Sequence, residues 1–88
     1  MPLEASLEEK VSEYTGAKYA TTIANCTAGL HLSCLAAGFG PGDEVIVPTN
    51  TMAATAFAAI QCGAVPVFAD SDPLTFNIDP VDVSRKIT

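Results

Sequence analysis

The chain has 88 residues, of which 49% are apolar, and it contains no tryptophan. This composition is typical of a globular α/β protein and excludes a disordered tail. Ten acidic residues against four basic ones give a net charge of −6, and because the basic residues form no cluster that could follow a phosphate backbone, nucleic acid is excluded as a partner.

The first predicted element is an amphipathic helix that ends at Gly16. Its apolar residues recur at intervals of four, four and three residues and are Leu3, Leu7, Val11 and Tyr14. Glutamates occupy the other faces of this helix, which is the pattern of a helix that buries one side. Ser6 and Glu9 have the spacing of a capping box, although the periodicity favours an earlier helix start.

The N-terminal residues carry acids and no apolar signal-peptide core. The longest apolar run is also far below the ~20 residues that span a bilayer. We therefore expect a soluble, cytoplasmic protein with no membrane segment.

A strand is predicted over Tyr19–Ala24, followed by a helix over Thr27–Ala37 that is apolar on nearly all sides. Such a helix packs under a sheet and against other helices. The next segment, Phe39–Asp43, reads FGPGD and predicts a type II turn. In this turn Pro41 fixes φ at the second position, and Gly42 supplies the positive φ at the third.

The second half of the chain continues the alternation of strands and helices. A strand over Glu44–Val47 precedes a helix over Met52–Cys62, for which Asn50 or Thr51 is the expected N-cap. A third strand covers Val65–Ala69.

Two prolines locate the last elements. Pro66 has no N–H to donate to a neighbouring strand, so the third strand either belongs at a sheet edge or is unpaired on one side at its first residues. Asp79 followed by Pro80 predicts the start of a final helix. The resulting order, α-β-α-β-α-β-α, is typical of a parallel sheet with helical crossovers.

The three cysteines, Cys26, Cys34 and Cys62, are odd in number, and their spacing matches no zinc or redox motif. His31 lies three residues before Cys34 on the same helix face, but two ligands without a third make a poor metal site. We therefore expect no bound metal and interpret His31 and Cys34 as a buried structural pair.

The junction between the first strand and its helix is the candidate ligand site. In open parallel sheets, ligands bind beyond the carboxyl ends of the strands, where the next helix presents unpaired N–H groups and a partial positive charge. The helix entry is Cys26, Thr27, Ala28 and Gly29. These residues offer amides and a hydroxyl and place no bulky side chain in the path of a phosphate.

A structural explanation of the same junction stays open. Asn25 or Thr27 can simply cap a buried helix, and small residues let that helix approach its neighbour. The stretch is neither a Walker loop nor a dinucleotide fingerprint, because it lacks the Gly-Lys-Ser/Thr ending of the one and the three-glycine spacing of the other.

Four segments together resemble a known family. They read GPGDEVIVPT at 40–49, TMAAT at 51–55, GAVPVFAD at 63–70 and NIDP at 77–80. They are similar to the N-terminal part of the large domain of DegT/DnrJ/StrS aminotransferases, the sugar aminotransferases among fold type I pyridoxal-phosphate enzymes. The resemblance implies that residues 1–88 are an incomplete part of that PLP-binding domain, which has a mainly parallel seven-stranded sheet.

The resemblance also implies which residues hold pyridoxal 5'-phosphate. In that family a Ser-Gly-Thr turn holds the cofactor phosphate, and the matching residues here are Asn25, Cys26 and Thr27. The threonine is kept, so Thr27 and the amides of Cys26 and Ala28 are assigned to the phosphate. Met52 matches an aromatic residue that stacks on the cofactor ring. Its thioether can contact an aromatic face favourably, although methionine is also a common filler at the base of a helix.

The family's Schiff-base lysine and the aspartate that pairs with the cofactor's ring nitrogen match no position in these residues. The resemblance therefore assigns no catalytic residue here, and we expect the 88-residue chain to be inactive alone, as a fragment of a longer product. In the family the first strand pairs with later strands, so Tyr19–Ala24 is expected to lack its neighbours in a chain with a marginal core.

By resemblance, the complete protein is an aminotransferase that works as a homodimer. It would move an amino group from an amino acid, with glutamate as the expected donor, to a keto group of a nucleotide-linked sugar. Two alternatives stay open: a sugar dehydratase of the same family, and a non-catalytic phosphate-binding module. A nucleotide-binding Rossmann half would need a glycine fingerprint and an acidic residue where Pro48 and Thr49 stand.

Overall fold

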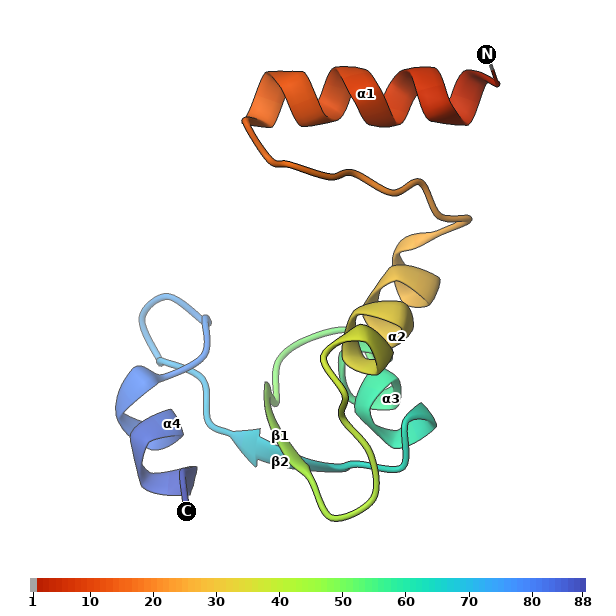
Figure 1. The fold of residues 1–88 in the computed structure, drawn as a ribbon. Helices are drawn as coiled ribbons and strands as arrows, with labels where there is room; N and C mark the ends of the chain where they lie inside the picture. The colour runs from red at the N-terminus through yellow and green to blue at the C-terminus, as the bar shows by residue number, and fades with distance from the viewer. Residues whose placement is uncertain (1) are drawn as a thin grey trace.

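A computed structural model describes residues 2–88. Its elements, in chain order, are α1 (Leu3–Thr15), α2 (Cys26–Ala36), β1 (Glu44–Pro48), α3 (Ala54–Gln61), β2 (Val65–Ala69) and α4 (Pro80–Lys86). Figure 1 shows α2 beside α3, which in turn packs against both strands, whereas α1 lies apart at the end of an extended segment. The described chain is accordingly elongated, with extents of 47 × 33 × 21 Å.

The two strands form a parallel pair connected through α3, as the alternating pattern predicts. Glu44 lies opposite Val65 and Pro48 opposite Ala69. The buried apolar residues gather around this unit and are Val47, Ala58, Ala59, Ala64 and Ala69. Because four of the five are alanines, α3 can approach the strands closely, but little apolar area is buried.

The turn that leads into β1 has the predicted geometry. Gly42 has a φ of 92°, and the Asp43 amide donates to the Gly40 carbonyl at 3.0 Å. The carboxylate of Asp43 also accepts the Gly40 amide at 2.8 Å. Glycine at the third position is therefore required by the positive φ of this type II turn.

The strand predicted over Tyr19–Ala24 is wrong for this chain, because these residues form no strand. The sheet of the described residues contains β1 and β2 only, and a β-strand is stable only when a neighbour accepts and donates its backbone hydrogen bonds. The segment instead links α1 to α2 (Figure 1).

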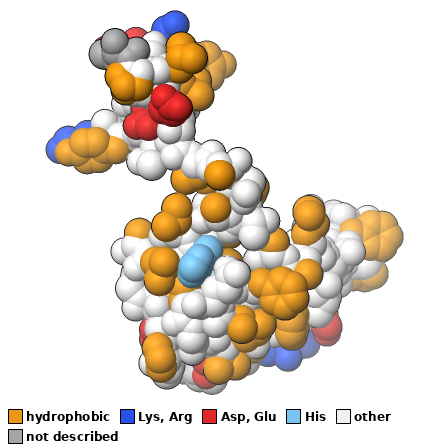
Figure 2. Space-filling model, turned by 90° about the vertical axis from the view of Figure 1, so that its right-hand side faces the viewer, with side chains coloured by type: hydrophobic (Ala, Val, Ile, Leu, Met, Phe, Trp, Pro, Cys, Tyr) orange, Lys and Arg blue, Asp and Glu red, His pale blue; other side chains and the backbone are white. Residues whose placement is uncertain are grey.

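Helix α1 begins at Leu3, so Ser6 lies inside the helix and the Ser6–Glu9 capping box is not formed. Gly16 ends the helix with a φ of 78°, as predicted. None of the residues of α1 is buried, and its apolar face is open to solvent. Figure 2 shows hydrophobic side chains exposed both on the separate α1 portion and on the larger body of the chain.

The helix predicted over Met52–Cys62 begins two residues later, at Ala54. Its N-cap is Ala53, which makes no side-chain cap hydrogen bond, so the expected capping by Asn50 or Thr51 is wrong. The reason is a tight turn before the helix, in which the Thr55 amide donates to the Met52 carbonyl at 3.1 Å. Met52 therefore lies in the loop that enters α3.

Helix α4 has the predicted start. The Asp79 carboxylate accepts the Val81 amide at 2.9 Å, and Pro80 occupies the first helical position. Asp82 in the first turn is 7% exposed, and its Oδ2 accepts the Asp70 amide at 2.7 Å. This bond joins α4 to the residue that follows β2.

Candidate functional site

The N-terminus of α2 is built by an asparagine cap. Asn25 is extended, with a φ of −164°, and its Oδ1 accepts the Ala28 amide at 2.8 Å. Its carbonyl accepts the Gly29 amide at 3.1 Å. The first amides of a helix have no partner within it, so those of Cys26 and Thr27 are the two that Asn25 leaves for a ligand.

Part of the small-residue stretch has a packing explanation. A Cβ built on Gly29 would overlap the Cδ1 of Ile23. This atom is the end of a flexible, exposed side chain that can turn aside, so the contact favours glycine at this position without requiring it. It leaves Cys26 and Thr27, both exposed, without such an explanation.

A cavity of about 180 Å³ lies between the entrances of α2 and α3. Its lining residues are Cys26, Thr27, Leu30, Thr51, Met52, Ala54 and Thr55. Three of the four residues assigned from the sequence thus meet at one place, while Ala28 is not among the lining residues. The residues from the α3 side follow the carboxyl end of β1, where ligands of parallel sheets bind.

Two threonines of this cavity carry polar atoms that the sequence analysis did not assign to the site. The hydroxyls of Thr51 and Thr55 lie 3.1 Å apart and form a hydrogen bond. Their signal in the sequence was their spacing of four residues at the start of the helix predicted over Met52–Cys62, which places them on one face of it. Met52, between them in the chain, is 78% exposed, so its thioether is free to contact a bound molecule at the cavity.

The electrostatics of this helix entrance favour an anion. No acidic residue occupies the first turn of α2, and the helix dipole places about half a positive charge there. The described residues contain no group of three or more His, Cys, Asp or Glu side chains that could hold a metal ion.

The cysteines lie near the same pair of helices but outside the cavity, apart from Cys26. His31 and Cys34 are half-buried, so their interpretation as a buried pair is wrong; α2 is covered on one side only. Cys62 is half-buried, and its thiol approaches the His31 carbonyl at 3.9 Å. Burial, and then the neighbouring Cys34 thiol, raise the pKa of Cys62 above its usual value.

This pKa predicts the order in which the cysteines react. The thiolate attacks iodoacetamide and displaces iodide, so Cys62 should be alkylated slowest and should need a higher pH than an ordinary thiol. The exposed Cys26 should react first. Peptide mass spectrometry of the full-length protein after short exposures at several pH values measures this order. Equal rates for Cys26 and Cys62 near neutral pH would contradict it.

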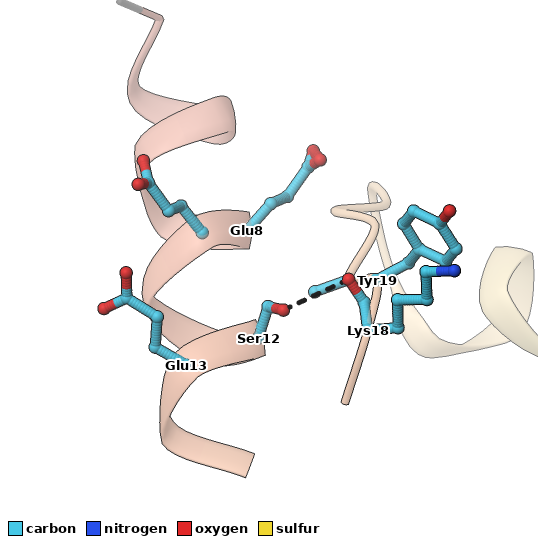
Figure 3. A pocket seen from close by; sticks show the side chains of 7 residues that line it. Glu8, Ser12, Glu13, Lys18 and Tyr19 are labelled. Atoms are coloured by element: carbon cyan, nitrogen blue, oxygen red, sulfur yellow. Dashed lines mark hydrogen bonds between the residues drawn. The ribbon is translucent and has the colours of Figure 1, made fainter. Parts of the chain in front are cut away.

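A second cavity, of about 300 Å³, lies between α1 and the segment that follows it. Figure 3 shows Glu8, Ser12 and Glu13 of α1 on one side and Lys18 and Tyr19 on the other. The Lys18 ammonium lies 5.4 Å from the centre of the Tyr19 ring. This cavity contains none of the residues assigned to a cofactor.

The fold and the first cavity define an α/β protein that presents a helix N-terminus beyond the carboxyl end of a parallel strand pair, the arrangement with which such proteins bind phosphate groups. The chain belongs to the DegT/DnrJ/EryC1/StrS aminotransferase family, whose model matches residues 2–88. The family predicted from the four sequence segments is confirmed.

Two curated relatives illustrate the similarity. GDP-perosamine synthase of Caulobacter vibrioides is 47% identical over 81 residues, which are 92% of this chain and 22% of that protein. UDP-2-acetamido-2-deoxy-3-oxo-D-glucuronate aminotransferase of Pseudomonas aeruginosa is 44% identical over 87 residues, which are 99% of this chain and 24% of that protein. The chain spans less than a quarter of the length of these relatives.

A solved structure confirms the predicted fold class. Spr1654 from Streptococcus pneumoniae, in its PLP form and in its PMP form, matches this chain with a TM-score of 0.94 and 35% identity. The match covers 100% of this chain and 22% of that one. No helix within residues 2–88 is long and apolar enough to cross a membrane.

Proposed function

We propose that these residues form the N-terminal part of the PLP-binding large domain of an aminotransferase that acts on a nucleotide-linked keto sugar. The observation that carries the proposal is the cavity in which Cys26, Thr27 and Met52 meet, in a chain whose described residues match the aminotransferase family throughout. The two relatives named above, with GDP and UDP sugars in their names, support a nucleotide-linked substrate.

The residues present fit the phosphate of pyridoxal 5'-phosphate. Asn25 leaves the amides of Cys26 and Thr27 for a ligand, the Thr27 hydroxyl is exposed beside them, and no carboxylate in the first turn of α2 repels an anion. Cys26 and Thr27 would hold the phosphate, and Met52 would lie against the cofactor ring. Of the residues assigned from sequence, Ala28 has its amide bonded to Asn25, so its contribution would be steric.

When bound, the cofactor supplies the electron sink that lets an amino group move from an amino-acid donor, expected to be glutamate, to the keto carbon of the sugar. The part that residues 1–88 would play is to bind and orient. The lysine and the aspartate that this chemistry needs match no position here, so we propose that the segment alone is inactive. We also propose, from the family resemblance, that the complete protein is cytoplasmic and acts as a homodimer.

The test is a coupled assay of the full-length protein with glutamate and a panel of nucleotide-linked keto sugars. We expect 2-oxoglutarate and an amino sugar to form in equal amounts, and borohydride to trap the cofactor on the protein. Loss of water from the sugar without consumption of glutamate would contradict the proposal and indicate a sugar dehydratase. Absence of both reactions, with no cofactor bound, would contradict the proposal and indicate a non-catalytic binding module.

A further inference from the structure

Asn25 caps the N-terminus of α2 and thereby determines which of the first amides of this helix are left for a ligand. Its carboxamide oxygen already holds the Ala28 amide at 2.8 Å, and its carbonyl holds the Gly29 amide at 3.1 Å. The Gly29 bond is the first regular bond of the helix, so of the amides of Cys26, Thr27 and Ala28, which have no helical partner, the Asn25 side chain satisfies one, that of Ala28. Only the amides of Cys26 and Thr27, beside the cavity, are left for a ligand.

We propose that Asn25 is a positioning residue for the cofactor phosphate. This inference rests on the phosphate site proposed above, which consists of the amides of Cys26 and Thr27 and the Thr27 hydroxyl and is called the seat below. By holding the Ala28 amide, Asn25 fixes the backbone of the first turn and so fixes the directions of the Cys26 and Thr27 amides. The phosphate is then held by these two amides and the Thr27 hydroxyl, while the Ala28 amide makes no contact with it. Asn25 acts through the helix backbone and does not touch the cofactor.

The absence of charge on Asn25 is part of this role. Aspartate caps helices as well as asparagine does, and this chain uses one at α4, where Asp79 accepts the Val81 amide. At α2 a carboxylate would lie next to the seat of a doubly negative phosphate and repel it. Capping and charge can therefore be separated by substitution at this one position.

The experiment compares three variants of the full-length protein with the wild type. Asn25→Ser keeps a neutral cap, Asn25→Asp keeps the cap but adds a negative charge, and Asn25→Ala removes the cap. Hydrogen exchange at the Ala28 amide, measured without cofactor, reports the cap. Titration of the cofactor-free protein with pyridoxal 5'-phosphate reports the affinity. Thr27→Val is titrated in parallel, because it tests the seat itself.

We expect Asn25→Ser to match the wild type in both measurements. Asn25→Ala should exchange faster at Ala28 and bind the cofactor roughly fivefold more weakly. Asn25→Asp should protect Ala28 as well as the wild type does and yet bind at least about tenfold more weakly, a separation that a purely structural role would not give.

The inference is overturned if Asn25→Ala binds the cofactor as tightly as the wild type, because the cap would then not position the amides. It is overturned too if this variant binds more tightly, because Asn25 would then compete with the phosphate for the Ala28 amide. It is also overturned if Asn25→Asp binds like the wild type while Thr27→Val binds weakly; in that case the seat stands without a role for Asn25. If Asn25→Asp and Thr27→Val both bind like the wild type, the seat itself is wrong.

Discussion

Replacing Thr27 with valine should weaken binding of pyridoxal 5'-phosphate to the full-length protein by about 10- to 150-fold. Valine has nearly the same shape but no hydroxyl, so the variant loses one hydrogen bond to a charged group, worth about 1.5–3 kcal/mol. Thr27 is exposed at the cavity between α2 and α3, so the substitution removes no buried packing. Equilibrium titration of the cofactor-free protein measures the change.

Two controls separate the hydroxyl from the shape of the cavity. Thr27→Ser keeps the hydroxyl and should retain most of the affinity. Thr55→Val removes a hydroxyl from the same cavity, one that is bonded to Thr51 and has no assigned role in binding the phosphate. Weakened binding in Thr55→Val together with unchanged binding in Thr27→Val would indicate that the phosphate binds on the α3 side of the cavity.

Replacing Asp82 with alanine should loosen the contact between α4 and the end of β2, where the Asp79 amide still donates to the Asp70 carbonyl at 2.9 Å. The Asp82 carboxylate is buried and accepts the Asp70 amide at 2.7 Å, so its removal leaves a backbone amide without a partner. Such a loss costs about 1–3 kcal/mol, which corresponds to a roughly 5- to 150-fold faster hydrogen exchange at Asp70. Exchange of the full-length protein, followed by mass spectrometry or NMR, measures it.

Asp82→Asn is the matched control, because its amide oxygen can still accept the Asp70 N–H. We expect its exchange at Asp70 to lie between those of the wild type and Asp82→Ala. Unchanged exchange in Asp82→Ala would show that another group satisfies the Asp70 amide, and that this bond does not join α4 to the strand.

Local signals in the sequence were sufficient for the elements whose partners lie close in the chain. The Gly40–Asp43 turn follows from Pro41 and Gly42, whose backbone preferences are intrinsic. The Asp79 cap of α4 follows from the Asp-Pro pair. The parallel pairing of β1 and β2 could be predicted because it requires only a crossover helix between them, and the apolar, alanine-rich segment 52–62 predicted that helix.

The segment Tyr19–Ala24 shows where such reasoning fails. Its residues favour an extended backbone, but a strand also requires a neighbour, which no local pattern supplies. The start of α3 fails for a related reason. Asn50 and Thr51 are good caps in isolation, yet a tight turn at Met52 moves the helix start to Ala54.

The site was predicted in part. Cys26, Thr27 and Met52 meet at one cavity, although only the family resemblance linked positions 26 and 52. The hydrogen bond from Ala28 to Asn25 was not predictable as part of the site, because capping and phosphate binding use the same residue types. Thr51 and Thr55 were missed because the sequence does not show that they line the same cavity as the start of α2.

The most direct test of this account is a crystal structure of the full-length protein with pyridoxal 5'-phosphate bound. We predict that phosphate oxygens lie at hydrogen-bond distance, about 2.7–3.2 Å, from the amide nitrogens of Cys26 and Thr27 and from the Thr27 hydroxyl, with Met52 against the cofactor ring. A phosphate held by other residues, with the α2 entrance open to water, would contradict the account.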